Sequence, residues 1–291
     1  MTKISTIGER NKLSAEFDSV RDVFRVIRKL GWQPNRDKSS DDRGRSGGGG
    51  FHTFGDLAEA LHVYEHTPDK VREFSIMDDR LESIESPGKD VAYDVTGDFI
   101  DIDRFLTGEP ENMGNAVMGN PKSIFCTINV LTSFVHYTTT EYQIAKQKRI
   151  LRIVDFLETQ GIRCQIVAQD DSAVAFISTV IKQFQDPFDL NDLAVVCHPD
   201  WLRRVEFLIM EQSDTFQSGY GSALDYDRKM QKYSPEPEDG VYVYIGGYIP
   251  YTDGVDELNK NFDKLEAKLI NLVNEGMTWN DEPFVIGGGK W

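Results

Sequence analysis

The strongest constraint on the fold is an alternation of strand-type and helix-type segments between residues 122 and 276. Short apolar runs typical of strands are found at 123–130, 162–168, 173–180 and 241–251. Apolar residues at helical spacing lie between and after them, at 140–157, 200–212 and 255–274. This order predicts an α/β fold in which a Rossmann-like, mostly parallel sheet is flanked by helices through right-handed crossovers.

Two of these helices carry clear apolar stripes. The first opens on a capping-box spacing, Thr140 and Gln143, and ends before Gly161 at the C′ position. Its expected buried residues are Ile144, Ile150, Leu151, Val154 and Leu157. The last helix repeats apolar residues at intervals of four and three, namely Leu258, Phe262, Leu265, Leu269 and Leu272. This second stripe either covers the sheet of its own domain or pairs with another subunit, and we favour the sheet.

The N-terminal part predicts a helix followed by a linker. The helix would be capped by Ser14 and stopped by Gly31, and its apolar residues would be Phe17, Val20, Phe24 and Ile27. Residues 35–50 contain no hydrophobic side chain and end in four consecutive glycines, which indicates a flexible linker. A glycine-rich phosphate-binding loop is the alternative, but no strand precedes this segment and no GK[ST] motif follows it.

Residues 51–120 predict a small α+β module. Thr53 and Asp56 have capping-box spacing and would open a helix whose inward residues are Phe54, Leu57, Leu61 and Tyr64. Alternation on both sides of Thr96-Gly97 indicates a hairpin or a bulged strand, after which Asp103 would cap a short helix. We therefore expect an N-terminal helix (1–34), a linker (35–50), the small module (51–120), a Rossmann-like domain (121–276) and a C-terminal tail (277–291).

Charge and cysteine content exclude some classes of function. The chain has 32 Lys and Arg against 48 Asp and Glu, a formal net charge of −16. This balance argues against direct nucleic-acid binding and against docking on anionic lipid, both of which need clustered basic residues. No apolar run approaches a membrane span, and the polar start is not a signal peptide. The three cysteines, Cys126, Cys164 and Cys197, are typical of reduced core thiols in a cytoplasmic protein.

Polar residues near the carboxyl ends of the predicted strands are the first candidates for a ligand site. They are Asn129 and Ser133 after the first strand, Asp170 and Asp171 after the second, and Tyr248 after the last. Such oxygen ligands suit Mg²⁺, but Asp170-Asp171-Ser172 fits a polar turn between strands better. Because the first strand has no carboxylate, we expect no bound metal, no cofactor and no catalytic residue here.

Other candidates have simpler explanations. The carboxylates Asp94, Asp98, Asp101 and Asp103 could support acid–base or two-metal chemistry, but their alternation fits the solvated side of a strand. His62 and His66 share a helix face without a third ligand, which fits a solvated pair. Arg203 and Arg204, like Arg149 and Arg152, either contact an acidic partner or pair with local carboxylates such as Glu206.

Three segments together resemble an uncharacterised family of tailed-bacteriophage and prophage proteins, over roughly residues 51–275. They are HTFGDLAEAL (52–61), DFIDIDRFLTGEPENM (98–113) and DLNDLAVVCHPDWLRRVEFLIME (189–211). The family has no established activity, so the resemblance implies an origin in a phage rather than a reaction.

The order of elements in residues 122–276 also resembles a von Willebrand factor A domain of the cobaltochelatase type. In that family the first strand ends in Asp-x-Ser-x-Ser, which holds a metal; here Ser133 matches and Asn129 replaces the carboxylate. Gly246-Gly247 stands where that family has a later Asp. The resemblance implies a degenerate metal site, a partner-binding surface that needs no metal, and an AAA+ ATPase as a candidate partner.

We therefore expect a non-enzymatic, phage-encoded interaction protein in the host cytoplasm. Its Rossmann-like domain would bind a protein partner, either beside an AAA+ ATPase or within a homo-oligomer. Two alternatives stay open. One is a metal-dependent enzyme acting on phosphorylated or nucleotide substrates, with Asp170, Asp171 or the 98–103 cluster as its carboxylates. The other is an acidic DNA-mimic decoy that occupies a host protein through its −16 charge.

Overall fold

A computed structural model was analysed, and it describes seventeen stretches of the chain. They are residues 2–7, 12–33, 57–67, 71, 91–95, 99–100, 104, 107–111, 113–116, 125–132, 139–160, 162–172, 174–186, 189–213, 241–245, 254–274 and 284–286. The predicted linker (35–50), the Thr53–Asp56 cap, Asp103, Gly161 and the side chain of Leu272 lie outside the described residues.

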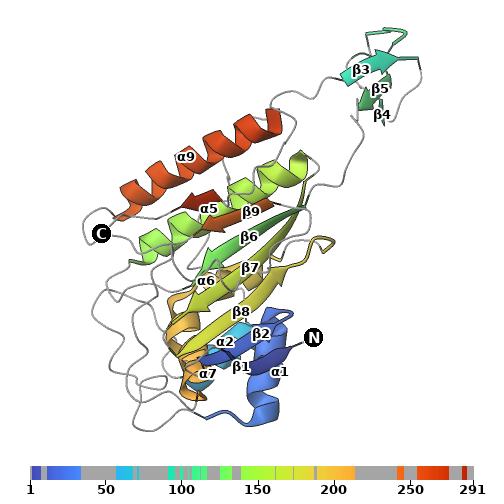
Figure 1. The fold of residues 1–291 in the computed structure, drawn as a ribbon. Helices are drawn as coiled ribbons and strands as arrows, with labels where there is room; N and C mark the ends of the chain where they lie inside the picture. The colour runs from blue at the N-terminus through green and yellow to red at the C-terminus, as the bar shows by residue number, and fades with distance from the viewer. Residues whose placement is uncertain are drawn as a thin grey trace.

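A seven-stranded sheet forms the centre of the molecule (Figure 1). In spatial order its strands are β1 (Lys3–Ile7), β2 (Lys12–Phe17), β8 (Ala175–Lys182), β7 (Arg163–Asp171), β6 (Phe125–Leu131), β9 (Val241–Ile245) and β10 (Phe284–Ile286). Four neighbouring pairs are parallel, and β1–β2 and β7–β8 are antiparallel. The predicted mostly parallel α/β sheet flanked by helices is confirmed.

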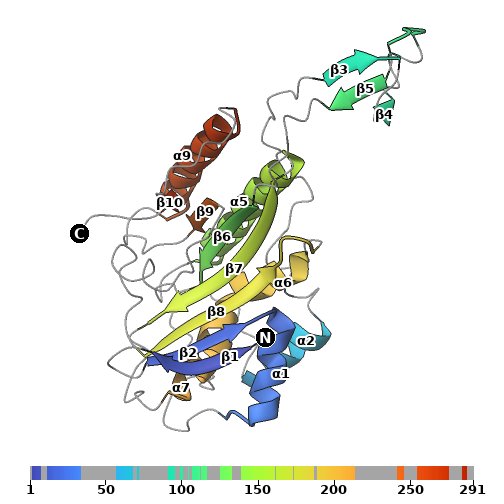
Figure 2. The same ribbon diagram turned by 45° about the vertical axis from the view of Figure 1, so that its right-hand side comes forward.

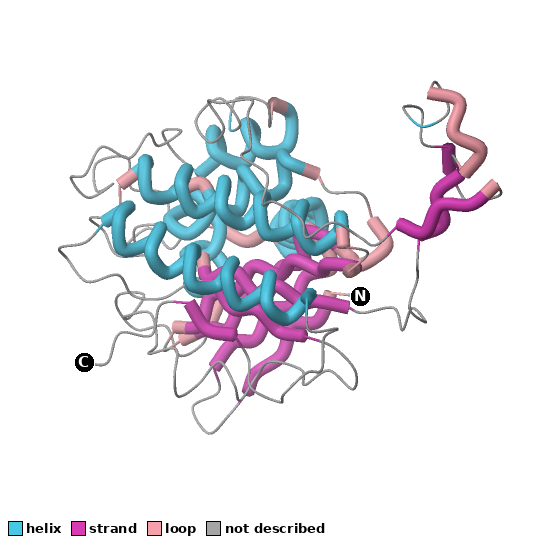
Figure 3. Tube along the Cα trace, turned by 90° about the horizontal axis from the view of Figure 1, so that it is seen from above, coloured by secondary structure: helices cyan, strands magenta, loops and turns pink. Residues whose placement is uncertain are grey.

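The helices form one layer beside the layer of strands (Figure 3). They are α1 (Val20–Leu30), α2 (Leu57–His66), α5 (Thr140–Thr159), α6 (Leu190–Cys197), the π-helical turn η2 (Trp201–Glu206), α7 (Phe207–Glu211) and α9 (Gly254–Asn274). Alternate side chains of the strands, such as Ile128, Ile166 and Ile177, join helix residues such as Trp201 and Phe262 in one hydrophobic core. We call this side of the sheet the helix face and the other the open face.

The N-terminal helix begins later than its apolar pattern predicts. Residues 12–17 form β2, which pairs in parallel with β8, so Ser14 lies in a strand and is not a helix cap. The reason is a period of two: Leu13, Ala15 and Phe17 are buried on the helix face. The true N-cap is Ser19, whose hydroxyl accepts the N–H of Asp22 at 3.1 Å. The predicted end is confirmed, because Gly31 adopts φ 62°.

The two long helices of the C-terminal half are confirmed. In α5, Ile150, Leu151, Val154 and Leu157 are buried and Ile144 is half-buried. Its cap is one residue earlier than predicted, because Thr139 accepts the N–H of Tyr142 at 3.2 Å. In α9, the described stripe residues Leu258, Phe262, Leu265 and Leu269 are all buried, and the helix packs against α5 and β10.

A second, three-stranded sheet stands away from the large one (Figures 1 and 2). Its strands are β3 (Val91–Asp94), β5 (Met113–Ala116) and β4 (Phe99–Ile100), in that order, and both neighbouring pairs are antiparallel. Strands on both sides of Thr96-Gly97 are therefore present, but they do not form a hairpin with each other. Each pairs with β5, which takes the central position of the small sheet. The division of the chain into domains stays a prediction.

Candidate functional site

The point where strand order reverses lies between β6 and β9. Numbered along the chain, the five strands from β6 to β10 have the spatial order 3-2-1-4-5. In open α/β sheets, ligands bind beyond the carboxyl ends of the two strands at such a reversal. Those ends are Leu131 and Ile245. Of the predicted site residues, Asn129 lies on β6 next to this point, whereas Ser133 and Tyr248 lie outside the described residues.

The structure places Asn129 and Asp170 on opposite faces of the sheet. Asn129 lies opposite Val167 in the ladder, on the open face, and is 3% exposed. Asp170 is three residues further along β7, on the helix face, and is 2% exposed. Asp171 pairs through its backbone with Phe176, and its side chain lies outside the described part of the chain. Asn129 and Asp170 therefore do not belong to one oxygen-ligand site.

The predicted turn begins after the two aspartates. Both Asp170 and Asp171 belong to β7, and the turn into β8 starts at Ser172. The hydroxyl of Ser172 accepts the N–H of Ala175 at 3.1 Å, and its own N–H donates to the Ala175 carbonyl at 2.9 Å. Asp170 is thus left inside the sheet, with its side chain under the helices.

On the helix face, Glu206 of η2 gathers a group of buried polar side chains. Its Oε1 accepts the hydroxyl of Thr132 at 2.7 Å and the indole N–H of Trp201 at 2.9 Å. The carboxyl group of Asp170 lies within hydrogen-bonding reach of Glu206. We call these four residues, with Lys146, the η2 cluster. Its members range from 0% to 7% exposed.

The surroundings of Glu206 in the η2 cluster favour the protonated form of its carboxyl group. Burial raises the pKa of Glu206 well above its ordinary value, and the charge of Asp170 raises it further. The hydrogen bonds from Thr132 and Trp201 act in the opposite direction but do not outweigh burial. Two neighbouring carboxyl groups away from water ionise together only at high cost, so the pair favours a protonated Glu206.

Lys146 of α5 supplies the positive charge of the cluster. Its ammonium group donates to the carbonyl of Leu131, the last residue of β6. Burial lowers the pKa of Lys146, while Cys197 and Glu206 raise it. Lys146 thus places a basic group near the carboxyl group of Glu206, and a buried polar group needs such a partner.

His198 holds a second polar contact just before η2. Its Nδ1 accepts the backbone N–H of Asp200 at 3.2 Å and lies 3.0 Å from the hydroxyl of Tyr64. Nδ1 is therefore the acceptor, and the ring proton of the neutral imidazole is on Nε2. Phe24, Tyr64 and Trp201 pack their rings together around this contact. The arrangement fixes α2 against η2 and gives His198 a structural role.

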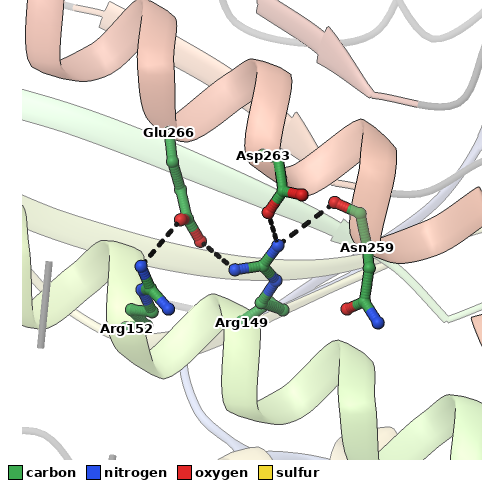
Figure 4. Close-up of polar contacts among 5 residues, drawn as sticks. All are labelled: Arg149, Arg152, Asn259, Asp263 and Glu266. Carbon is green, nitrogen blue, oxygen red and sulfur yellow. Dashed lines mark hydrogen bonds and ion pairs between the residues drawn. The ribbon is translucent and has the colours of Figure 1, made fainter. Parts of the chain in front are cut away.

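The candidate arginines differ in their surroundings. Arg204 is 3% exposed, and its Nε lies 3.9 Å from the carboxylate of Asp200. Arg203 is half-buried, and burial lowers its pKa. On α5, Arg149 and Arg152 contact Glu266 of α9 at 3.0 and 3.3 Å, and Arg149 also pairs with Asp263 (Figure 4). Arg149 and Arg152 therefore link α5 to α9 within the chain.

The other predicted candidates are placed as follows. His62 and His66 are exposed, with ring centroids 4.8 Å apart on α2. Asp94 belongs to β3, and Asp98, Asp101 and Asp103 lie outside the described residues. Cys126, Cys164 and Cys197 are free, buried thiols. Within the part of the chain that the structure describes, no three His, Cys, Asp or Glu side chains are grouped to hold a metal ion.

Sequence reasoning missed Glu206 and Lys146 as members of a buried cluster. The apolar residues around each of them predict the correct element. Their burial, however, depends on η2, and no residue type predicts a π-helical turn. The burial of Asp170 was predictable. It lies two residues after Ala168 and four after Ile166, so its side chain is on the same buried face of β7. π-Helical turns occur frequently at functional positions.

The fold and the site define a two-layer α/β protein whose strand-order reversal is bordered by a buried polar cluster. The chain belongs to the family of the domain of unknown function DUF7192, whose model matches residues 2–269. No curated protein and no solved structure matches the chain. Among the described residues, no helix is both long enough and apolar enough to cross a membrane.

Proposed function

We propose that this chain is a non-enzymatic, phage-encoded interaction protein that binds a protein partner in the host cytoplasm. The observation that carries the proposal is the small sheet of β3, β5 and β4, which stands away from the large sheet in both ribbon views (Figures 1 and 2). Its strands have 4, 4 and 2 residues. A sheet this small has little core of its own, so contact with another surface would stabilise it.

The small sheet also offers groups that a partner could contact. Val95, directly after β3, is 64% exposed. Residues 107–111, which precede β5, are exposed, and Gly108 adopts φ 77°. Binding surfaces commonly contain exposed loops and exposed apolar side chains.

The resemblance to a von Willebrand factor A domain is part of this proposal. The strand order, with its reversal between β6 and β9, supports it, as does Asn129 in the place of a metal-holding carboxylate. The partner would then be an AAA+ ATPase or a second copy of this chain.

The test compares partners captured by the tagged full chain from host lysate with those captured by two variants. The first variant is Val95→Asp, and the second replaces residues 91–116 by a short Gly-Ser linker. Lys260→Asp, an exposed change on α9, is the matched control. The proposal expects one protein, identified by mass spectrometry, that both variants lose and the control retains. If all four chains with unchanged circular dichroism capture the same proteins, the small sheet is not the binding surface.

A further inference from the structure

β1 is one of the two edge strands of the large sheet and lies next to β2 (Figure 1). It pairs with β2 from Lys3 opposite Glu16 to Ile7 opposite Lys12, and no other described strand pairs with it. The side chains of residues 3–6 are exposed, Ile4 to 41%. The outward N–H and C=O groups of such an edge are ready to pair with another extended chain.

A row of basic residues on α1 lies beside the start of β1. Asp22 accepts the hydroxyl of Thr2 and also pairs with Arg25, so Arg25 lies next to the residue that precedes β1. Lys29 is four residues further along α1 and therefore on the same side of the helix. Both are exposed, and the side chain of Arg25 to 71%.

This basic row contrasts with the charge of the whole chain. The described residues between 2 and 33 contain six Lys and Arg against three Asp and Glu, a local net charge of +3, whereas the chain carries −16. On the neighbouring side of α1, Arg28 pairs with Glu65 of α2. The positive charge of Arg21 interacts electrostatically with Asp192 of α6. Arg25 and Lys29 are thus the charges that α1 presents toward the β1 side.

We propose that β1 accepts an extended, acidic segment of a partner protein as an added edge strand, with the carboxylates of that segment beside Arg25 and Lys29. Main-chain hydrogen bonds to β1 give the affinity, and the basic row selects an acidic segment. A second copy of this chain is a poorer occupant, because its own β1 edge brings the same positive charge. This surface is separate from the small sheet, and the inference does not depend on the function proposed for that sheet.

The first experiment measures fluorescence anisotropy of the full chain with two labelled peptides. The first peptide has nine residues and alternates Glu with Val. The second, a control peptide, has Lys in place of every Glu. Binding of the Glu peptide alone is expected, and Arg25→Glu with Lys29→Glu should weaken it by about tenfold or more. Lys260→Glu with Lys264→Glu makes the same charge change on exposed positions of α9 and should leave the affinity unchanged.

The second experiment tests the backbone of β1 with Ile4→Pro and Ser5→Pro. Neighbouring N–H groups of a strand point to opposite sides, so one proline removes an outward donor and the other removes a donor to β2. We expect the proline that removes an outward N–H donor to abolish peptide binding and to leave the melting temperature unchanged. Equal binding of both peptides would overturn it, as would affinity that neither proline changes. A dimer in sedimentation velocity that the outward proline dissociates would also overturn it, by making a second copy the occupant.

Discussion

The hydroxyl of Thr132 donates a 2.7 Å hydrogen bond to Oε1 of Glu206, and this contact joins the end of β6 to the π-helical turn η2. Trp201 donates to the same oxygen, and Asp170 approaches the carboxyl group from β7. The helix-face end of these parallel strands is therefore occupied by side chains of the chain itself. This arrangement fits a protein that uses its surface for binding better than one that holds a substrate at this end of the sheet.

The raised pKa of Glu206 makes stability depend on pH. Because burial raises the pKa of Glu206 above its ordinary value of 4.5, the folded protein keeps a proton that the unfolded chain releases. Folding above that pH takes up a proton, so the free energy of unfolding falls as pH rises toward the folded-state pKa. The contribution of one proton is at most about 1.4 kcal/mol per pH unit. Glu206→Gln should remove it, because the amide donates to Asp170 without titrating.

Urea unfolding of the wild type and Glu206→Gln between pH 5 and 8 measures this effect. The stability of the variant relative to the wild type should increase with pH. Glu111→Gln, at an exposed position outside the cluster, should not change the pH dependence. A difference between wild type and Glu206→Gln that is the same at every pH would show that the pKa of Glu206 is not raised in the folded protein.

Arg149 anchors α9 to α5. It donates to Glu266 at 3.0 Å and to the backbone carbonyl of Asn259 at 3.1 Å, and it pairs with Asp263 (Figure 4). Arg149→Leu should lower the free energy of unfolding by roughly 1–3 kcal/mol, less than the loss of a fully buried pair because Asp263 is exposed. Arg149→Lys keeps the charge without the forked geometry and should recover part of this loss.

Chemical denaturation of these two variants checks the prediction, with Asp155→Asn on the exposed side of α5 as the control. If Arg149→Leu is as stable as the control, the contacts between the two helices contribute nothing measurable and α9 is held by its apolar stripe alone.

The parts of the fold that the sequence predicts are those with one dominant pattern. β6, β7, α5 and α9 each have an apolar period that neighbouring residues do not contradict. β2 was missed because Phe17 continues the helical spacing of Val20 and Phe24 across the boundary at Ser19, so two patterns of different period overlap. The pairing of β3 and β4 with β5 was missed because partner choice in a small sheet depends on residues distant in sequence.

The site was predictable only in its place along the chain. Strand ends could be located, so Asn129 and Asp170 were found, but their separation onto two faces depends on the register of β6 against β7. Glu206 and Lys146 resemble solvated helix charges in the sequence. Their burial follows from η2 packing over β6 and β7, which is a tertiary effect.

Gly31 ends α1 with φ 62°, and nothing lies within 4 Å of the position that a Cβ atom would take. Gly31→Ala therefore tests backbone conformation alone, without a steric clash. We expect a loss of about 1 kcal/mol in the free energy of unfolding, because an L-residue with a Cβ atom is disfavoured in this conformation. Gly31→Asn should lose less, since Asn tolerates it better. Thermal and urea unfolding of both variants measure the difference; equal stability of Gly31→Ala and wild type would contradict the assigned φ.

Leu265 is 3% exposed in the middle of α9, and its helix packs against α5 and β10 of the same chain. Leu265→Ala should therefore lower the free energy of unfolding by roughly 2–5 kcal/mol, as truncation of a buried leucine does. Lys264→Ala, at the exposed neighbouring position, should change it little. Because the stripe is covered within the chain, the mass in solution from light scattering should stay the same. A Leu265→Ala variant that converts an oligomer into a folded monomer with an unchanged melting temperature would instead place Leu265 in a contact between subunits.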